Sequence, residues 1–446
     1  MLSRVALIGE NSVGYIQALL DIWNNGDCAV LIDWRVPFET AIEMMKEANV
    51  EKCYIGVGLY SEIRDEAYNK VLFVRYEQVS LKAELLPSST YDKFKENYSR
   101  EEAVVIYSSG TTGKSKGIVL SHYAINTNAD AIIDYMKPAS NDCIYICKTL
   151  SHSSTLVGEL LVALKTGTKL LISPIIVPPR CVLNNIEKYG VTVLCTNPTL
   201  LSLYTDTYNP SKFNLSSLRT IYVSGSILND KVYRKAHSAF INVPIYNVYG
   251  LSEAGPRVTA QKASCNRSNS VGTAIKSVQV SIVDDEGTLL SANQRGYIHV
   301  KTPSIFNGYV KGETKHPSKY KDWLNTGDVG FWDENGELHV IGRSDDVINI
   351  DAHKIYPQDI EAAIYRVSAI KECVVTAVEY DNDPVLCCAY VSETDISVDI
   401  RKKLGEVLLR YEIPKRFVRV DKLPKTRTGK TQVAEVQRML KDKFKR

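Results

Sequence analysis

The chain has 446 residues, of which 44% are hydrophobic and 24% are charged. This balance excludes a disordered or low-complexity protein and predicts a globular protein with a large buried core. The net charge of +3 argues against a protein that binds nucleic acid or a membrane surface over its whole length. Two or three domains fit the length, because large α/β enzymes often exceed the usual domain size.

The charge is unevenly distributed along the chain. Residues 401–446 contain 16 basic and 5 acidic residues, so residues 1–400 carry a net charge of −8. The last tenth of the sequence is therefore a basic segment attached to an acidic body.

Signals for export or membrane insertion are weak. The apolar stretch 5–9 near the N-terminus is too short for the core of a signal peptide. No stretch approaches the ~20 apolar residues that cross a bilayer, since the best one, 170–177, is interrupted by Pro174. The ten cysteines form no CxxC pair, which favours buried free thiols over a zinc site or a disulfide framework. We therefore expect a cytoplasmic protein without a membrane span.

Short apolar runs alternate with helical patterns through the first half of the chain. Runs at 5–8, 28–32 and 52–55 are separated by helical patterns at 12–23 and 38–48. This βαβαβ order predicts a mostly parallel sheet covered by helices. The same reading predicts a helix at 123–135 and strands at 104–107, 142–147, 169–172, 193–196 and 220–224.

The pattern of predicted elements changes in the second half of the chain. Residues 270–300 read as short strands with turn signals such as Asp285-Glu286-Gly287, which predicts a small antiparallel sheet or partial barrel. After Gly342 we expect a new unit with a hairpin around Asn349 and Asp351. Its further elements are predicted as helices at 357–367 and 398–409, strands at 373–378 and 385–391, and a basic tail.

The strongest local signal is YSSGTTGKSKG at residues 107–117, which directly follows the apolar run 103–106. Its glycines let the backbone turn tightly and aim amide groups at an anion, while hydroxyls and Lys116 add donors and positive charge. The segment is therefore suited to bind polyphosphate. It is not a Walker A loop, because Gly110 lies only three residues before Gly113. The alternative is a flexible Ser/Gly linker.

This loop resembles the phosphate-binding signature of the adenylate-forming enzymes, which comprise acyl- and aryl-CoA synthetases, peptide-synthetase adenylation domains and luciferases. Ser115 stands where that signature usually has proline. Four further segments are similar to the family's motifs in the correct order. They are the adenine-and-metal motif at 247–253, the ribose motif at 326–328, the hinge motif at 342–346 and the C-terminal lysine motif at 423–430.

The resemblance spans the chain from about Val5 to Gln432 and implies an α/β fold. A large N-terminal domain, residues 1–343, would contain two βαβ-type subdomains and a small distorted β-barrel. A small mobile α+β domain, residues 344–446, would follow it. The resemblance also implies that this C-terminal domain rotates between an adenylating and a thiol-transfer pose, with Asp345 as the hinge.

The motifs imply a site for ATP and Mg²⁺. Thr111 and Lys116 would hold the phosphates, and Glu253 would ligate Mg²⁺, which prefers carboxylate oxygen. Tyr249 offers a ring face to adenine, and Asp328 can accept from both ribose hydroxyls. The nucleotide-binding residues implied are Ser108, Ser109, Gly110, Thr112, Gly113, Asn247, Tyr249, Gly250, Ser252, Asp328 and Arg343. The structural alternatives are a helix-start carboxylate for Glu253, a core residue for Tyr249 and a turn residue for Asp328.

Lys430 is the predicted catalytic residue of the first half-reaction. A single ammonium can contact both the substrate carboxylate and the α-phosphate, and so stabilise charge that builds in the transition state. A solvated lysine in a basic tail is the alternative.

The acyl pocket is the part of the predicted site that the sequence determines least. His152, Ser224, Gly225 and Ser226 align with segments that line it in the family. Amino-acid-activating members place an aspartate shortly after the first segment, whereas the only acid between 151 and 160 is Glu159. This favours a carboxylic acid without a free α-amino group, and the Ser/Thr cluster suits a small or hydroxylated acid. The alternative is that these hydroxyls cap a helix starting near Thr155.

We therefore expect an ATP-dependent carboxylate ligase that forms an acyl-AMP, releases pyrophosphate and passes the acyl group to the thiol of coenzyme A. A stand-alone adenylation enzyme that loads an acyl or aminoacyl group onto a phosphopantetheinyl carrier protein remains an alternative, since the basic tail could meet an acidic carrier helix. Ala352 replaces a glycine in the loop expected to face pantetheine, which weakens the expectation of thioester transfer to either acceptor. A nucleic-acid-binding protein or an inactive nucleotide sensor is disfavoured, because the tail has few aromatic residues and both Glu253 and Lys430 are present.

Overall fold

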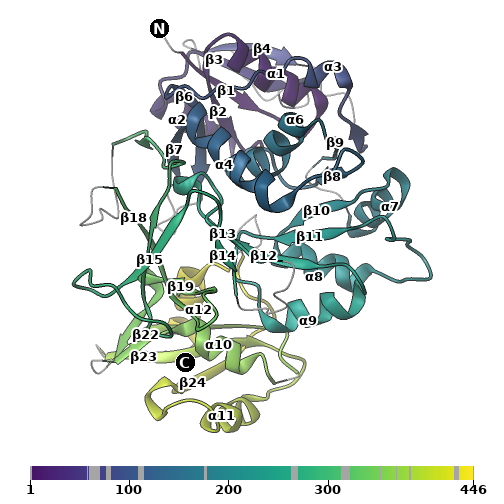
Figure 1. The fold of residues 1–446 in the computed structure, drawn as a ribbon. Coiled ribbons are helices and arrows are strands. Elements are labelled where there is room, and N and C mark those ends of the chain that lie inside the picture. The colour runs from purple at the N-terminus through teal and green to yellow at the C-terminus, as the bar shows by residue number, and fades with distance from the viewer. Residues whose placement is uncertain are drawn as a thin grey trace.

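The structure is a computed structural model of the chain. It describes all residues except 1–2, 58, 60–70, 77–81, 109–114, 175–177, 263–269, 313–321, 351–352, 368, 381–382, 426–430 and 445–446. The large N-terminal part holds three sheets, and a smaller C-terminal part lies beside the third of them (Figure 1).

The first sheet has seven strands in the order β17-β7-β6-β2-β1-β3-β4. The strands are β1 (Arg4–Ile8), β2 (Cys28–Ile32), β3 (Lys52–Gly56), β4 (Leu72–Tyr76), β6 (Glu102–Ser108), β7 (Lys116–Ser121) and β17 (Gly308–Tyr309). Those from β4 to β6 run parallel, and β7 and β17 join antiparallel at one edge. The predicted parallel sheet is confirmed.

Helices cover both faces of this sheet. Every buried position of β1 is apolar, on whichever face of the sheet it lies. Leu7 packs in the cluster of helix α1 (Val13–Asn24), whereas its neighbour Ala6 packs in the cluster of helix α2 (Phe38–Glu47). Successive strand residues point to opposite faces, so a continuous apolar run requires a helix on each side.

The second sheet has eight strands in the order β14-β13-β12-β11-β10-β8-β9-β5. They are β5 (Glu84–Leu85), β8 (Cys143–Ile146), β9 (Lys169–Ile172), β10 (Val193–Thr196), β11 (Thr220–Val223), β12 (Ile245–Tyr249), β13 (Thr259–Ala260) and β14 (Thr273–Ala274). Its helices are α3 (Ser88–Tyr91), α4 (His122–Met136), α5 (Ser153–Thr155), η2 (Leu156–Leu161), α6 (Val162–Thr166), α7 (Pro179–Tyr189), α8 (Pro198–Thr207) and α9 (Asp230–Ala239). The largest core cluster joins α1, α4 and η2 to strands of both sheets.

A third, antiparallel sheet has the order β15-β16-β18-β19 and corresponds to the predicted partial barrel. Its strands are β15 (Gln279–Val283), β16 (Gly296–Lys301), β18 (Leu324–Trp332) and β19 (Leu338–Arg343). The short helix η3 (Ser252–Ala254) precedes it, and η4 (Ser344–Asp346) follows its last strand.

The C-terminal part is built around the sheet β22-β23-β24 and the hairpin β20-β21. Its elements are β20 (Ile348–Ile350), β21 (His353–Ile355), α10 (Pro357–Ile364), β22 (Glu372–Tyr380), β23 (Asp383–Val391), α11 (Ser397–Gly405), η5 (Arg410–Glu412), β24 (Arg416–Arg419) and α12 (Val433–Phe444). Two apolar clusters cover its two faces, one with α10 and α11 and the other with α12.

The two helices predicted near 357–367 and 398–409 are present, but both end earlier than expected. Helix α10 ends at Ile364 and α11 ends at Gly405, because Val367 and Leu408 pack on the core from turns rather than from a further helical turn. The predicted basic tail contains a strand and a helix that the sequence analysis did not identify. Strand β24 pairs with β23, and α12 buries Val436 and Leu440.

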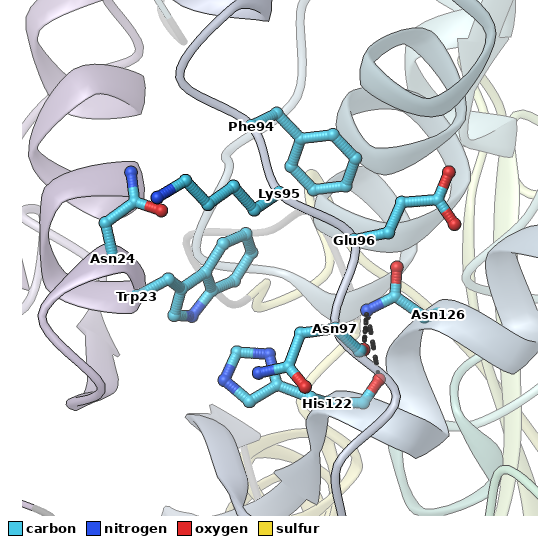
Figure 2. A pocket seen from close by; sticks show the side chains of 8 residues that line it. All are labelled: Trp23, Asn24, Phe94, Lys95, Glu96, Asn97, His122 and Asn126. Atoms are coloured by element: carbon cyan, nitrogen blue, oxygen red, sulfur yellow. Dashed lines mark hydrogen bonds between the residues drawn. The ribbon is translucent and has the colours of Figure 1, made fainter.

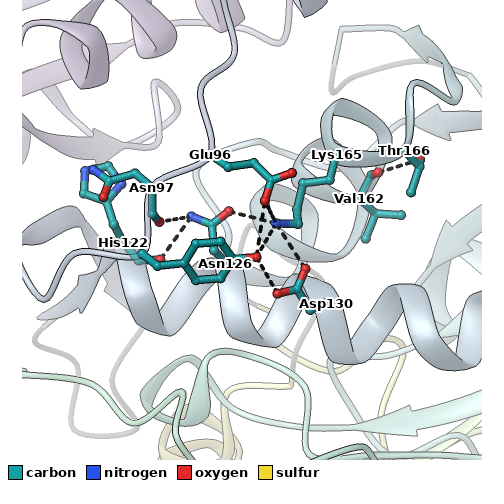
Figure 3. A network of polar contacts seen from close by, with 9 residues as sticks. Glu96, Asn97, His122, Asn126, Asp130, Val162, Lys165 and Thr166 are labelled. Atoms are coloured by element: carbon teal, nitrogen blue, oxygen red, sulfur yellow. Dashed lines mark hydrogen bonds and ion pairs between the residues drawn. The ribbon is translucent and has the colours of Figure 1, made fainter.

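A polar network fixes the segment before β6 against α4 and α6 (Figure 3). The Lys165 ammonium lies 2.9 Å from a Glu96 carboxylate oxygen and 3.1 Å from one of Asp130. The Tyr98 hydroxyl donates a 2.6 Å hydrogen bond to Asp130. The segment that leads into β6, and so towards the predicted phosphate loop, is thereby held in place.

The described cysteines are free, and all of them except Cys181 are buried. Of the helices in the described part of the chain, none combines the length and apolar character needed to cross a bilayer.

Candidate active site

The predicted phosphate loop connects β6 to β7. The two strands pair antiparallel up to Ser108 and Lys116, so the loop closes a hairpin. Ser109, Gly110, Thr111, Thr112 and Gly113 lie outside the described residues. The Lys116 ammonium lies 5.1 Å from the centre of the Tyr309 ring, at the edge of the same sheet.

Glu253 meets the same tyrosine. It lies in η3, and the Tyr309 hydroxyl donates a 2.9 Å hydrogen bond to its carboxylate. The Glu253 carbonyl accepts from the backbone amide of Phe306 at 3.0 Å. Burial and the Glu253 carboxylate together raise the pKa of Tyr309, which stays a neutral donor. Two predicted residues that are far apart in sequence therefore converge on Tyr309, a residue that no motif contains.

Asp328 is held by two further predicted residues. The Tyr249 hydroxyl donates to one of its carboxylate oxygens at 2.6 Å, and the Arg343 guanidinium donates to the other at 3.0 Å. Arg343 also donates to the Thr326 carbonyl at 2.9 Å. Burial raises the pKa of Tyr249 well above its usual range, and Asp328 adds to the effect. Asp328 lies within β18, so the alternative of a turn residue was wrong.

The remaining residues of the adenine-and-metal motif shape its backbone. The Asn247 side chain donates to the Ser270 carbonyl at 3.0 Å. A Cβ on Gly250 would lie 1.8 Å from the Pro256 carbonyl oxygen, so only glycine fits there. The Ser252 hydroxyl shares a 2.7 Å hydrogen bond with Ser153, which joins this motif to the predicted acyl-pocket segment.

The hydroxyls around residue 153 do not cap a helix. His152 is the residue before α5, and no side chain caps that helix. Ser151 instead shares a 2.8 Å hydrogen bond with Thr149. The capping alternative was therefore wrong.

On the other predicted wall, Ser224 follows β11 and its amide donates to the Thr196 carbonyl at 3.0 Å. Gly225 adopts a φ of 96°, and both Gly225 and Ser226 are exposed. The chain therefore turns sharply at the end of β11, next to the helix cap Asn197.

Asp345 lies exposed in η4, between the third sheet and the C-terminal part. Side chains bridge these two parts. Lys354 lies 2.7 Å from Asp285, and Arg295 pairs with Asp359. A further contact comes from α9, where Lys231 donates to the Ile370 carbonyl at 2.5 Å. Lys430 and Ala352 lie outside the described residues.

The sequence analysis did not identify three participants near the site. They are Tyr309, the buried Arg257, and Lys148 as the partner of Glu159 at 2.8 Å. Arg257 lies four residues after Glu253, so an unusual buried arginine beside a motif was the available signal. The sequence around Tyr309 does not indicate a role in the site, because only the pairing of β17 with β7 brings this residue close to the phosphate hairpin.

A cavity of about 200 Å³ lies elsewhere, between α1, residues 94–97 and the start of α4 (Figure 2). Trp23 and His122 meet edge to face on its wall at 5.8 Å. None of the predicted site residues lines it.

Glu253 is the candidate ligand for Mg²⁺ in this site. Among the described residues, no three His, Cys, Asp or Glu side chains gather as a metal site. Mg²⁺ commonly binds proteins through one or two carboxylates and completes its shell with water and substrate phosphate. A single carboxylate beside the phosphate hairpin fits that mode.

Comparisons with known proteins agree with the motifs. A family model described as AMP-binding enzyme matches residues 2–310, and one described as AMP-binding enzyme C-terminal domain matches residues 359–430. The 4-coumarate–CoA ligase 2 of Petroselinum crispum is 27% identical over 453 residues, covering 96% of this chain and 82% of that protein.

Two solved structures show the same fold. ATP-bound MatB from Rhodopseudomonas palustris superposes with a TM-score of 0.88 at 21% identity, covering 100% of this chain and 90% of that one. O-succinylbenzoate coenzyme A synthetase from Bacillus subtilis, in complex with ATP and magnesium ion, has a TM-score of 0.82 at 21% identity, with 98% and 89% covered. The chain therefore belongs to the AMP-binding enzyme family, as an AMP-forming acid–thiol ligase of the acyl-CoA synthetase type.

Proposed function

We propose that the protein activates a carboxylic acid with ATP and transfers the acyl group to coenzyme A. In the first step a carboxylate oxygen attacks the α-phosphorus, the bond to the β-phosphate breaks, and pyrophosphate leaves with its electron pair. In the second step the thiol sulfur attacks the acyl carbon and AMP leaves. The observation that supports this best is the convergence of Lys116 and Glu253 on Tyr309, beside the loop suited to phosphate.

The nucleotide would lie between this cluster and Asp328. Each oxygen of Asp328 accepts a hydrogen bond from the protein, and a carboxylate is the group that would accept from the ribose hydroxyls. Arg343 donates to that carboxylate and so orients it. Glu253 would hold Mg²⁺, which would neutralise phosphate charge, while Tyr249 and Gly250 would border the adenine.

Phosphate binding is assigned to the hairpin loop. Lys116 and the hydroxyls of Thr111 and Thr112 would carry it, because preorganised donors stabilise charge that accumulates on a leaving pyrophosphate. The backbone amides of the loop would add further donors, through Ser108, Ser109, Gly110 and Gly113.

We also propose that the chain divides at residues 343 and 344, with Asp345 as the hinge. Support comes from the apolar cores: the clusters of the N-terminal sheets do not extend past Val340, and those of the C-terminal part begin at Ile348. Among the described residues, ion pairs bridge the two parts and neither apolar cluster spans them, so a rotation would break ion pairs rather than an apolar core. Lys430 would reach the substrate in the adenylating pose.

The substrate would lack a free α-amino group. The only acid in the first acyl-pocket segment, Glu159, is paired with Lys148 and fully buried, so it is not placed to hold a substrate ammonium as well. The names of the relatives, which are CoA ligases, support coenzyme A as the acceptor.

The test is acid-dependent exchange of labelled pyrophosphate into ATP, measured over a panel of aliphatic, aromatic and amino acids. We expect exchange with one or more carboxylic acids and none with amino acids. Absence of exchange with every acid would refute the proposal. The acceptor is then decided by supplying the best acid with free coenzyme A or with a phosphopantetheinylated carrier protein, and thioester formation with free coenzyme A is the expected result.

A further inference from the structure

Arg257 is a buried cation that forms no ion pair with the residues that the structure describes. It lies on the segment after η3, and only 4% of its surface is exposed. Its Nε has no hydrogen-bond partner, and among the described residues its guanidinium forms no ion pair. Buried guanidinium groups are normally paired, because removing the charge from water is costly. An unpaired one calls for a ligand.

The nearest residue of the acyl-pocket segment is Gly158 in η2. A Cβ built on Gly158 would lie 3.1 Å from the Arg257 Nη2 atom. The absence of a side chain there leaves the space that the guanidinium occupies. Arg257 therefore reaches the segment that follows His152, which is one predicted wall of the acyl pocket.

The other charges close to Arg257 do not balance it. Lys148 and Glu159 form a buried ion pair of 2.8 Å, and the Glu159 side chain is fully buried. Burial raises the pKa of Glu159, and Lys148 and, more weakly, Arg257 oppose this rise; of these two cations, Lys148 forms the ion pair. Within the described part of the chain, these three side chains bring together two cationic groups and one carboxylate, an excess of one positive charge.

Further polar atoms in this neighbourhood also have no partner. The Tyr135 hydroxyl and the Thr155 hydroxyl are buried and make no hydrogen bond. The positive charge of Arg257 opposes the rise in the pKa of Tyr135 that burial causes. The Tyr135 ring packs edge to face on Tyr222, with 5.8 Å between the ring centres. Tyr222 directly precedes the second predicted wall of the pocket at Val223 and Ser224. A buried cation and unpartnered buried hydroxyls on neighbouring segments are the pattern expected of a polar ligand's binding site.

We propose that the acid activated by this enzyme carries a second carboxylate, and that Arg257 binds it. This inference rests on the proposed function. A guanidinium can hold a carboxylate through two parallel hydrogen bonds, and one negative charge would balance the excess positive charge. The carboxylate that reacts with ATP lies towards Glu253, and the second one lies at the far end of the acyl group, near Gly158 and Thr155.

The experiment compares acids of equal length that differ only in the second carboxylate. The pairs are butyrate and succinate, valerate and glutarate, hexanoate and adipate, and 4-methylbenzoate and terephthalate, each assayed by pyrophosphate exchange. The wild-type protein is expected to prefer the dicarboxylate of at least one pair. In Arg257→Met the ratio of kcat/KM for that dicarboxylate over its monocarboxylate falls by about 100-fold or more.

Two further variants control the result. Arg234→Met removes an arginine whose side chain is 78% exposed on α9, and it leaves the ratio unchanged. Gly158→Ala keeps the charge but pushes the guanidinium aside, and it lowers the ratio even if Arg257→Met does not fold. Thermal unfolding establishes that each variant is folded.

The possible failures are distinct. Exchange with monocarboxylates, but no preference for any dicarboxylate and no effect of either variant on the ratio, would overturn this inference and leave the proposed function intact. No exchange with any acid would overturn both.

Discussion

The Tyr309 hydroxyl donates a 2.9 Å hydrogen bond to the Glu253 carboxylate. Its ring also faces the Lys116 ammonium at 5.1 Å. Tyr309 therefore positions the proposed metal ligand against the phosphate hairpin, although it belongs to no nucleotide motif.

Tyr309→Phe tests this role. The variant keeps the ring but frees the Glu253 carboxylate, so we expect the Mg²⁺ concentration for half-maximal ATP binding to rise roughly threefold to tenfold. Calorimetric titration with ATP at several Mg²⁺ concentrations measures it. Tyr98→Phe is the matched control, because its hydroxyl also donates to a carboxylate, that of Asp130, in a different part of the molecule. An equal effect of both substitutions would contradict the assignment.

Asp328→Asn tests the proposed ribose contact. The substitution weakens an acceptor of ribose hydroxyls and leaves the partly buried Arg343 without its anion. We expect ATP affinity to fall roughly 10-fold to 100-fold, by 1.5–3 kcal/mol for hydrogen bonds to a charged group. Unfolding in urea should also show a loss of about 1–2 kcal/mol, reduced because Arg343 is a third exposed. The double variant Asp328→Asn with Arg343→Met should recover part of the stability but not the affinity.

The C-terminal domain has a pH-dependent stability through Glu361 on α10. Burial raises the pKa of this carboxyl to about 8, although it accepts a 2.8 Å hydrogen bond from the Val375 amide. Because the folded pKa lies above the unfolded one, the folded state retains a proton that the unfolded state loses. The contribution is complete below pH ~4.5 and decreases by about 1.4 kcal/mol per pH unit until pH ~8.

Glu361→Gln removes this dependence, since the amide resembles the protonated acid. The free energy of unfolding of the variant minus that of the wild type is therefore expected to increase from pH 5 to pH 8. Urea unfolding at each pH measures it, and the exposed Glu393→Gln serves as the control. A constant difference would show that Glu361 ionises normally in the folded protein.

Lys430→Ala separates the two half-reactions. If Lys430 acts only in adenylation, pyrophosphate exchange falls by ~100-fold or more, whereas thioester formation from a synthetic acyl-AMP is largely retained. Both rates are measured on the same preparation. An equal loss of both would contradict a two-pose cycle.

Much of the fold was predictable, because local patterns and topology agree in the N-terminal domain. Apolar runs such as 28–32, followed by amphipathic helices, specify a parallel sheet with two covered faces. The C-terminal domain was less predictable, because its many basic residues make the spacing of apolar residues hard to recognise in the sequence. Helix α12 buries Val436 and Leu440 at a spacing of four, but lysines and arginines surround them in the sequence.

Some residues of the candidate site were also predictable from the sequence, whereas others were not. Glu253, Asp328 and Arg343 lie in contiguous motifs, so short-range sequence identified them as candidates. Tyr309, Lys148 and the isolation of Arg257 depend on contacts between distant segments, and no local pattern encodes these. Whether a buried arginine is paired can only be read from the packed structure.

The transfer of ¹⁸O from the substrate tests the central claim most directly. An acid labelled in both carboxylate oxygens is incubated with ATP, Mg²⁺ and coenzyme A, and the phosphorylated products are analysed by mass spectrometry. Attack of the carboxylate on the α-phosphorus predicts one ¹⁸O atom in AMP and none in pyrophosphate. Label in inorganic phosphate, with ADP as the other product, would contradict an acyl-AMP intermediate.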